Sequence, residues 1–131
     1  MTIIKYLGKY PVSIILSMVI IYLSLFTPPE IGVTPPNNFD KLVHFAMYAG
    51  FCSIIWTEYL KKHRVIHKLK VTVWAVVMPM LFGGGMELAQ MFLTHDRSGE
   101  WADFLANSLG VLAAAVFFIS LTFFRKNKAV I

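Results

Sequence analysis

Four long apolar stretches, separated by short polar segments, make up most of the chain. They cover residues 7–26, 42–60, 71–93 and 103–124, and each is close to the length of about 20 mostly apolar residues that a helix needs to cross a bilayer. Because the connections are short, consecutive helices are expected to run antiparallel and to pack side by side. The pattern predicts a single all-α domain, residues 1–131, folded as an integral membrane four-helix bundle.

The composition is typical of a membrane protein rather than a soluble domain. Of the 131 residues, 57% are hydrophobic and 15% are charged, and the mean hydropathy is +0.66. The net charge of +5 comes from basic residues at the ends of the apolar stretches, not from one face interleaved with aromatic residues. We therefore expect contact with phospholipid head groups and no nucleic-acid partner. The lone cysteine, Cys52, is interpreted as a small core residue.

The distribution of Lys and Arg predicts the orientation. The first apolar stretch ends in SLFTPPE without a small-residue cleavage site, so we interpret it as a retained anchor. With four helices, the N-terminus, the loop between helices two and three, and the C-terminal tail lie on one side of the membrane. By the positive-inside rule that side is cytoplasmic, and both termini face it. These segments hold ten of the twelve basic residues: Lys5, Lys9, Lys61, Lys62, Arg64, Lys68, Lys70, Arg125, Lys126 and Lys128.

Two of the predicted helices begin with a polar face on the outer side. Asp40 and His44 are four residues apart at the start of the second helix, and Asp103 and Asn107 are four apart at the start of the fourth. Residues at this spacing share one face of a helix. Both polar faces therefore enter the membrane from the same side.

The end of the third helix supplies a further polar face at a similar depth. Glu87 and Gln90 are three apart, and Glu87 lies about 9 Å below the end of the helix at 1.5 Å per residue. A charge at that depth is costly unless it faces the bundle and finds a partner. The sequence leaves these pairings open: Glu87 with His44 or Arg97, and Asp103 with Arg97 or Lys41.

These polar groups allow two interpretations. In the structural one, Gln90 and Asn107 hydrogen-bond between helices, and Asp40 and Asp103 sit favourably at the positive ends of helix dipoles. That interpretation does not account for Glu87, which lies near the end of a helix, where the dipole disfavours a carboxylate. Because ionisable groups inside a membrane are usually functional, we favour a polar pocket that opens outward between helices two, three and four.

Four short motifs, in this order, resemble those of the VanZ-like family: DKLVHF at 40–45, MELAQMF at 86–92, DR at 96–97 and ADFLANSLG at 102–110. The segment SGEW before the last motif is slightly longer than the family pattern. The resemblance implies a small multi-helix protein of the bacterial cytoplasmic (inner) membrane. It also implies a role with lipid head groups or lipid-linked cell-envelope precursors. The family positions matched here are Asp40, Lys41, His44, Glu87, Gln90, Arg97, Asp103 and Asn107.

The first functional hypothesis is an enzyme that acts on a phosphate-linked lipid. Arg97 and Lys41 could bind phosphate, and His44 or Glu87 could serve as acid or base. A metal held by His44, Glu87 and Asp103 is conceivable, but no dense ligand motif such as H-E-x-x-H is present, so no metal or other cofactor is predicted. The catalytic candidates are His44, Glu87, Asp103 and Arg97, and the substrate-binding candidates are Asp40, Lys41, Gln90 and Asn107.

The second hypothesis is a binding or scaffold protein, in which the same residues hold a lipid head group or support an unknown protein partner without turnover. A proton-coupled transporter ranks last, because the inner halves of the helices lack matching ionisable groups apart from Glu58. The namesake of the family is associated with low-level resistance to teicoplanin. Nothing in these residues reports on a drug, so enzyme status and resistance both stay open.

Overall fold

The computed structural model describes residues 2–26, 32, 38–95, 100–124 and 129–130, and these are almost entirely helical. The predicted all-α class is confirmed. One parallel pairing of two-residue strands, Ile66 with Ala129 and His67 with Val130, is the only sheet among the described residues. The elements are α1 (Thr2–Leu7), α2 (Pro11–Leu25), α3 (Phe39–Lys62), β1 (Ile66–His67), α4 (Lys68–Thr72), the π-helix η1 (Val73–Val77), α5 (Met78–Leu93), α6 (Trp101–Phe124) and β2 (Ala129–Val130).

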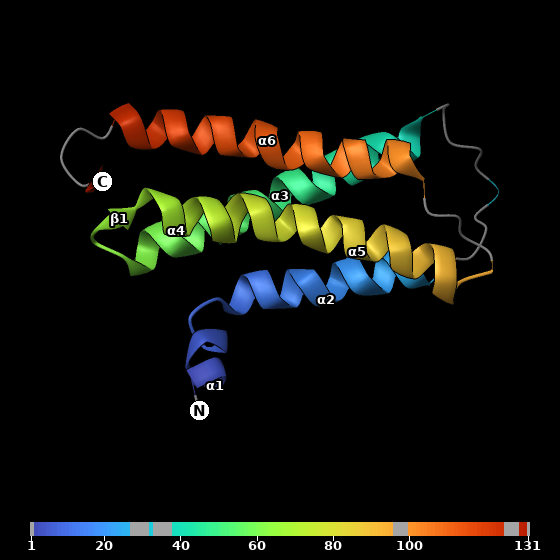
Figure 1. Ribbon diagram of the computed structural model, residues 1–131, viewed down its shortest axis with the longest axis horizontal. Helices are drawn as coiled ribbons and strands as arrows, with labels where there is room; N and C mark the ends of the chain where they lie inside the picture. Colours follow the sequence, from blue (N-terminus) through green and yellow to red (C-terminus); the bar gives the residue numbers. More distant parts are fainter. Residues whose placement is uncertain (1, 27–31, 33–37, 96–99, 125–128, 131) are drawn as a thin grey trace.

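The long helices run back and forth along one axis, each antiparallel to the next (Figure 1). Helix α3 packs most extensively against α6, α5 packs against α6, and α2 packs against both α3 and α5. Helix α2 begins and α6 ends at one end of the molecule. At the opposite end, here called the distal end, α5 ends and α3 and α6 begin.

Within the described residues, two helical stretches are long and apolar enough to cross a membrane, Lys68–Leu93 and Trp101–Thr122. Helix α2 is apolar but shorter, with 15 residues. Helix α3 has 24 residues and carries charged side chains near both ends. The four helical stretches predicted from the sequence are therefore present, but only two of them meet the criteria of length and apolarity for a membrane span.

The first long helix begins later than the sequence predicted, at Pro11 instead of near residue 7. Proline disfavours helical backbone in the residue before it and is itself well suited to the first position of a helix. The free amides of this helix start find a partner on α3. Val12 N and Ser13 N donate to the Glu58 carboxylate at 2.9 and 3.1 Å, and the Ser13 hydroxyl also donates to it. Buried Glu58 thus caps α2 from a neighbouring helix.

The third predicted helix is continuous from Lys68 to Leu93 but contains a π-helical turn at Val73–Val77. Pro79 follows this turn directly. A proline lacks the backbone N–H, and its ring collides with the carbonyl of the residue four positions earlier, here Ala75, in a regular α-helix. The wider π turn relieves that collision, so the helix passes the proline without ending.

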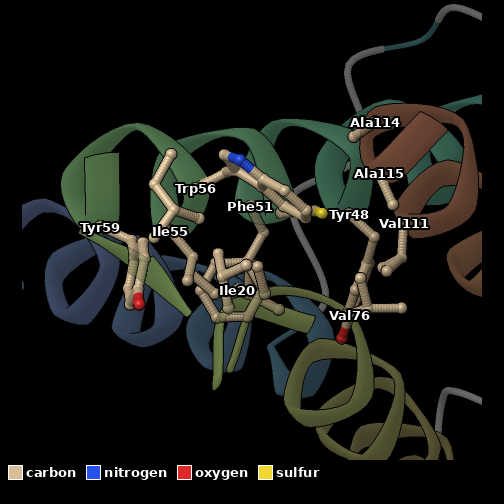
Figure 2. Packing of buried hydrophobic residues seen from close by; sticks show 14 residues of the cluster. Ile20, Tyr48, Phe51, Ile55, Trp56, Tyr59, Val76, Val111, Ala114 and Ala115 are labelled. Carbon is tan, nitrogen blue, oxygen red and sulfur yellow. The ribbon is translucent and has the colours of Figure 1, made fainter. Parts of the chain in front are cut away.

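Aromatic and aliphatic side chains from α2, α3, α6 and the segment from β1 to η1 form the hydrophobic core (Figure 2). Ile20, Cys52 and Val111 are fully buried, and Trp56 is nearly so, with its ring stacked on Phe118 at a centroid distance of 5.8 Å. The interpretation of Cys52 as a core residue is confirmed. This core lies between the distal end and the opposite end of the molecule, and it holds α3 against α6.

Helices α3 and α6 are in close backbone contact at Gly110. A Cβ atom added there would lie 2.2 Å from the carbonyl oxygen of Phe45 and 3.1 Å from the amide nitrogen of Ala49. Both contacts are to backbone, which cannot rotate away as a side chain can. Only glycine therefore permits this spacing of the two helices.

We predict that Gly110→Ala destabilises the chain by ~1–3 kcal/mol, because overpacking must push α3 and α6 apart. Thermal unfolding of the detergent-solubilised protein, followed by circular dichroism, measures this effect. Gly50→Ala is the matched control, since Gly50 lies on α3 and a Cβ there meets nothing within 4 Å. Equal melting temperatures for the two variants would contradict the close approach.

Candidate functional site

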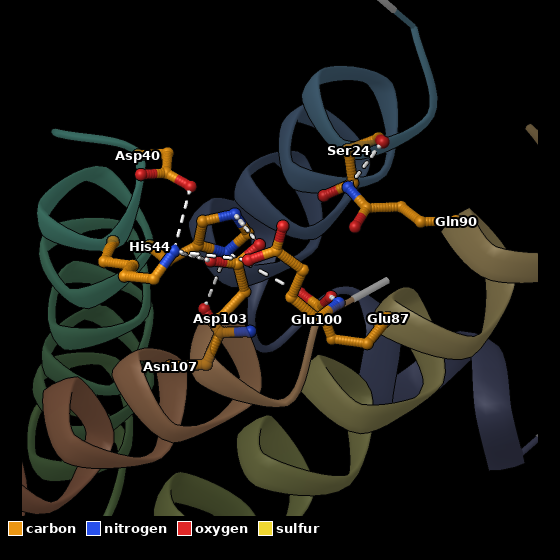
Figure 3. A network of polar contacts seen from close by, with 9 residues as sticks. Ser24, Asp40, His44, Glu87, Gln90, Glu100, Asp103 and Asn107 are labelled. Atoms are coloured by element: carbon orange, nitrogen blue, oxygen red, sulfur yellow. Dashed lines mark hydrogen bonds and ion pairs between the residues drawn. The ribbon is translucent and has the colours of Figure 1, made fainter. Parts of the chain in front are cut away.

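Polar side chains from three helices converge at the distal end (Figure 3). Three of these side chains lie on α3, one lies on α5, and three lie on α6 or directly before it. The helix starts present these groups because residues three or four apart face the same way. We call this set the polar cluster: Asp40, Lys41, His44, Glu87, Glu100, Asp103 and Asn107.

His44 lies at the centre of the polar cluster. Its Nδ1 is 2.9 Å from Asn107 Oδ1 and 3.8 Å from Glu87 Oε1, and its Nε2 is 3.7 Å from Asp103 Oδ2. Glu87, Asp103 and Asn107 are buried, with exposed fractions of 7%, 6% and 1%. Of the pairings that the sequence left open, the structure places Glu87 beside His44. It also places Asp103 beside Lys41, one of its two expected partners, and beside His44, with which the sequence grouped it only as a conceivable metal ligand.

Lys41 bridges the carboxylates at the rim of the polar cluster. Its Nζ is 3.3 Å from Asp40 Oδ2, 3.3 Å from Glu100 Oε2 and 3.5 Å from Asp103 Oδ1. Hydrogen bonds to Asp40 and then to Glu100 raise the pKa of Lys41, because both bonds favour its charged form. Lys41 is thus a firmly charged cation, already engaged with three acidic groups.

Glu87 also joins the end of α5 to the start of α6. Its Oε2 accepts a hydrogen bond from the backbone N–H of Glu100 at 3.1 Å. The carbonyl of Glu100 in turn accepts from the amides of Asp103 and Phe104, at 3.1 and 3.2 Å. Glu100 was not among the site residues predicted from the sequence. Its position three residues before Asp103 was the available signal, because that spacing places both acids on one helical face.

One predicted site residue makes its contact away from this cluster, and another lies outside the described residues. Gln90 is buried, but its Nε2 donates to the carbonyl of Ser24 at 2.8 Å, so it links α5 to α2 (Figure 3). Arg97, the predicted phosphate-binding cation, lies outside the described residues. The geometry tests neither the substrate-binding role predicted for Gln90 nor the catalytic role predicted for Arg97.

The polar cluster offers acid–base chemistry and metal ligands. His44 is an imidazole flanked by two buried carboxylates, a suitable setting for proton transfer. Ligand atoms of His44, Glu87 and Asp103 lie within 4.8 Å of one another, as do those of Asp40, Glu100 and Asp103. Among the described residues the polar cluster holds four carboxylates and one lysine, so carboxylates are in excess there.

Comparison with known proteins identifies one family. The VanZ/LLP1 family matches residues 2–125, which is nearly the whole chain. No curated protein and no solved structure matches the chain. The resemblance seen in the four short motifs is confirmed.

We predict that Asn107→Ala lowers the unfolding free energy by ~1–3 kcal/mol, because it leaves His44 Nδ1 without its closest partner in a buried site. Ser108→Ala is the control on the same helix. The Ser108 hydroxyl is buried without a hydrogen-bond partner among the described residues, so its removal is expected to be neutral or slightly stabilising. Denaturant unfolding in detergent measures both variants. A Ser108→Ala loss as large as that of Asn107→Ala would contradict the role of the His44 contact.

Proposed function

This chain belongs to the VanZ/LLP1 family, and from that membership and its polar cluster we propose that it binds the head group of a membrane lipid or a lipid-linked cell-envelope precursor. The proposal has three parts, which are a multi-pass protein of the bacterial cytoplasmic membrane, a four-helix bundle with both termini in the cytoplasm, and a binding site on the outer side. Different observations support each part.

The exposed apolar surface supports a membrane location. Large hydrophobic side chains on three of the long helices are more than 60% exposed, including Met18 on α2, Leu81 on α5 and Phe117 on α6. Soluble monomers rarely expose contiguous apolar surface on this scale. Together with the two helical stretches long enough to span a bilayer, this pattern favours helices that face lipid.

The distribution of charge along the antiparallel helices supports the orientation. The basic residues of the loop between α3 and α4 lie at the same end as the start of α2 and the end of α6 (Figure 1). The positive-inside rule assigns that end to the cytoplasm. The distal end, with the polar cluster, then faces outward at the level of the lipid head groups.

One observation carries the proposed binding role, namely two buried carboxylates, Glu87 and Asp103, placed on different helices around His44. Ionisable groups at this depth are costly to insert into a membrane and commonly mark a functional site. A head group from the outer leaflet can reach the same level without leaving the membrane surface. If the protein turns this ligand over, His44 or Glu87 is the candidate acid or base.

A structural role is the second candidate, and specific contacts favour it. Gln90 joins α5 to α2, and Glu87 accepts from the backbone of Glu100, so both residues stabilise the packing of helices. A substitution of His44 distinguishes an enzyme from a non-catalytic binder. In an enzyme, the substitution should abolish turnover and leave some lipid binding. In a non-catalytic binder, affinity and phenotype should fall together. Any effect on teicoplanin susceptibility would be a consequence of this binding.

The orientation predicts a pattern of thiol labelling in intact cells. In a Cys52→Ala background, His95→Cys at the distal end should react with a membrane-impermeant maleimide, because it faces outward. Arg64→Cys, in the loop after α3, should react only after the cells are permeabilised. Both positions are exposed, so burial does not explain a difference between them. Labelling of Arg64→Cys in intact cells would reverse the proposed topology.

The binding role predicts a lipid that co-purifies with the wild-type chain. Native mass spectrometry of gently extracted protein should show a phosphate-bearing lipid or lipid-linked species. His44→Ala and Glu87→Ala should reduce the bound fraction by about tenfold or more, as expected for loss of an interaction worth about 1.4 kcal/mol. His63→Ala, a histidine at the other end of α3, is the matched control. An absent ligand with a large stability loss in both variants would favour the structural role instead.

A further inference from the structure

The geometry points to a divalent metal site formed by His44, Glu87 and Asp103, in which the bound ion receives the phosphate of the head group. The role in recognition rests on the function proposed above, whereas metal binding itself does not. The three ligands come from α3, α5 and α6, and these helices are fixed by the core, so the site would be preorganised.

The spacing of the ligand atoms suits a first-row metal. One ring nitrogen of His44 and one oxygen from each carboxylate lie within 4.8 Å of one another. Ligands held about 2.0–2.2 Å from a zinc ion are separated by about 3–4 Å, so small side-chain rotations would close the set. Among the described residues, Glu87 uses only Oε2 for the backbone of Glu100, which leaves Oε1 for an ion, and Asp103 directs Oδ2 toward His44.

The contact between His44 and Asn107 prepares one nitrogen for the ion. An amide oxygen can only accept, so Asn107 Oδ1 at 2.9 Å requires the proton of a neutral imidazole to be on Nδ1. The lone pair of Nε2 then faces Asp103 Oδ2 at 3.7 Å, and both atoms are acceptors. Glu87 Oε1 lies 3.8 Å from Nδ1, so the Glu87 side chain must rotate to share an ion held on Nε2. Two facing acceptors need a cation or a proton between them. An outer partner that fixes the imidazole in this way is the usual arrangement at protein metal sites.

The charge of Lys41 distinguishes this site from a second group of acidic residues at the distal end. Asp40, Glu100 and Asp103 also lie close enough to hold an ion, but the ammonium of Lys41 is already within 3.5 Å of all three. Asp103 Oδ1 faces Lys41, and its Oδ2 faces His44. Oδ1 is buried without a hydrogen bond among the described residues. The ion therefore belongs on the His44 side.

The ligand chemistry narrows the ion and its role. One imidazole and two carboxylates suit Zn²⁺ or Mn²⁺, whereas Mg²⁺ and Ca²⁺ prefer oxygen ligands alone. Three protein ligands leave at least one coordination position open, as in metal sites that bind substrate. The described part of the polar cluster carries an excess of carboxylates and would repel a phosphate. A divalent ion reverses that repulsion and gives the phosphate oxygen a direct partner.

Zinc titration of the full chain tests the inference. The detergent-solubilised protein is stripped with a chelator, and Zn²⁺ alone is added while binding is followed by calorimetry. We expect one ion per wild-type chain and a rise in melting temperature that a chelator reverses. His44→Gln and Asp103→Asn should weaken binding at least tenfold. Asp40→Asn, which removes an exposed acid that contacts Lys41, should bind as the wild type does.

Several outcomes overturn the site, and one of them needs no variant. A wild-type chain that binds neither Zn²⁺ nor Mn²⁺ would contradict the site. Binding that falls in Asp40→Asn but persists in His44→Gln would move the ion to the exposed acidic group. Binding lost equally in His63→Gln and His44→Gln would indicate ions on surface histidines.

The same preparations distinguish failure of the metal site from failure of the lipid proposal. Native mass spectrometry with and without Zn²⁺ should show the phosphate-bearing species retained more strongly when the metal is present. Metal bound at His44 without any lipid would support the site and contradict the proposed function. Lipid retained equally with and without a chelator would support the function and contradict the role of the metal in recognition.

Discussion

The close approach of α3 and α6 at Gly110 is the contact on which the geometry of the distal end depends. Gly110, Asn107 and Asp103 follow one face of α6, because they are spaced by three and four residues. At Gly110 that face meets the backbone of α3 at Phe45, the residue next to His44. The backbone contact therefore fixes the register in which Asn107 and Asp103 reach His44. A shift of either helix would separate these groups.

Because the surrounding helices are apolar, the buried polar groups of the cluster have to find their hydrogen-bond and charge partners among themselves. Glu87 is buried near the end of α5, where the helix dipole disfavours its charge, and it compensates by contacts to His44 and to the backbone of Glu100. These contacts hold the ends of two helices together. The binding role proposed for Glu87 would therefore come in addition to this structural role, because a site built from such residues must also stabilise the fold.

The features of the fold and of the candidate site that could be predicted from the sequence are those that depend on the spacing of residues along the chain. Helix existence, the shared face of Asp103 and Asn107, and the convergence of three polar helix ends follow from spacing along the chain, and all are observed. The capping of α2 by Glu58 and the bond from Gln90 to Ser24 join residues 45 or more positions apart, and no spacing rule reveals such partners. The helix start at Pro11 was missed because hydropathy alone continued through it. Arg97 lies outside the described residues, so its role stays a prediction.

A comparison of two buried acids shows why burial alone does not define a site. The Glu58 carboxylate, 8% exposed, accepts hydrogen bonds from two amides and a hydroxyl, so its negative charge is well satisfied by α2. The Asp103 carboxylate is equally buried, yet the nearest basic side chains among the described residues are Lys41 at 3.5 Å and His44 at 3.7 Å. An acid with short donors on every side is capped and has little capacity to bind anything else. Asp103 keeps its acceptor capacity, and this excess of acceptors is the physical reason to look for a ligand at the distal end.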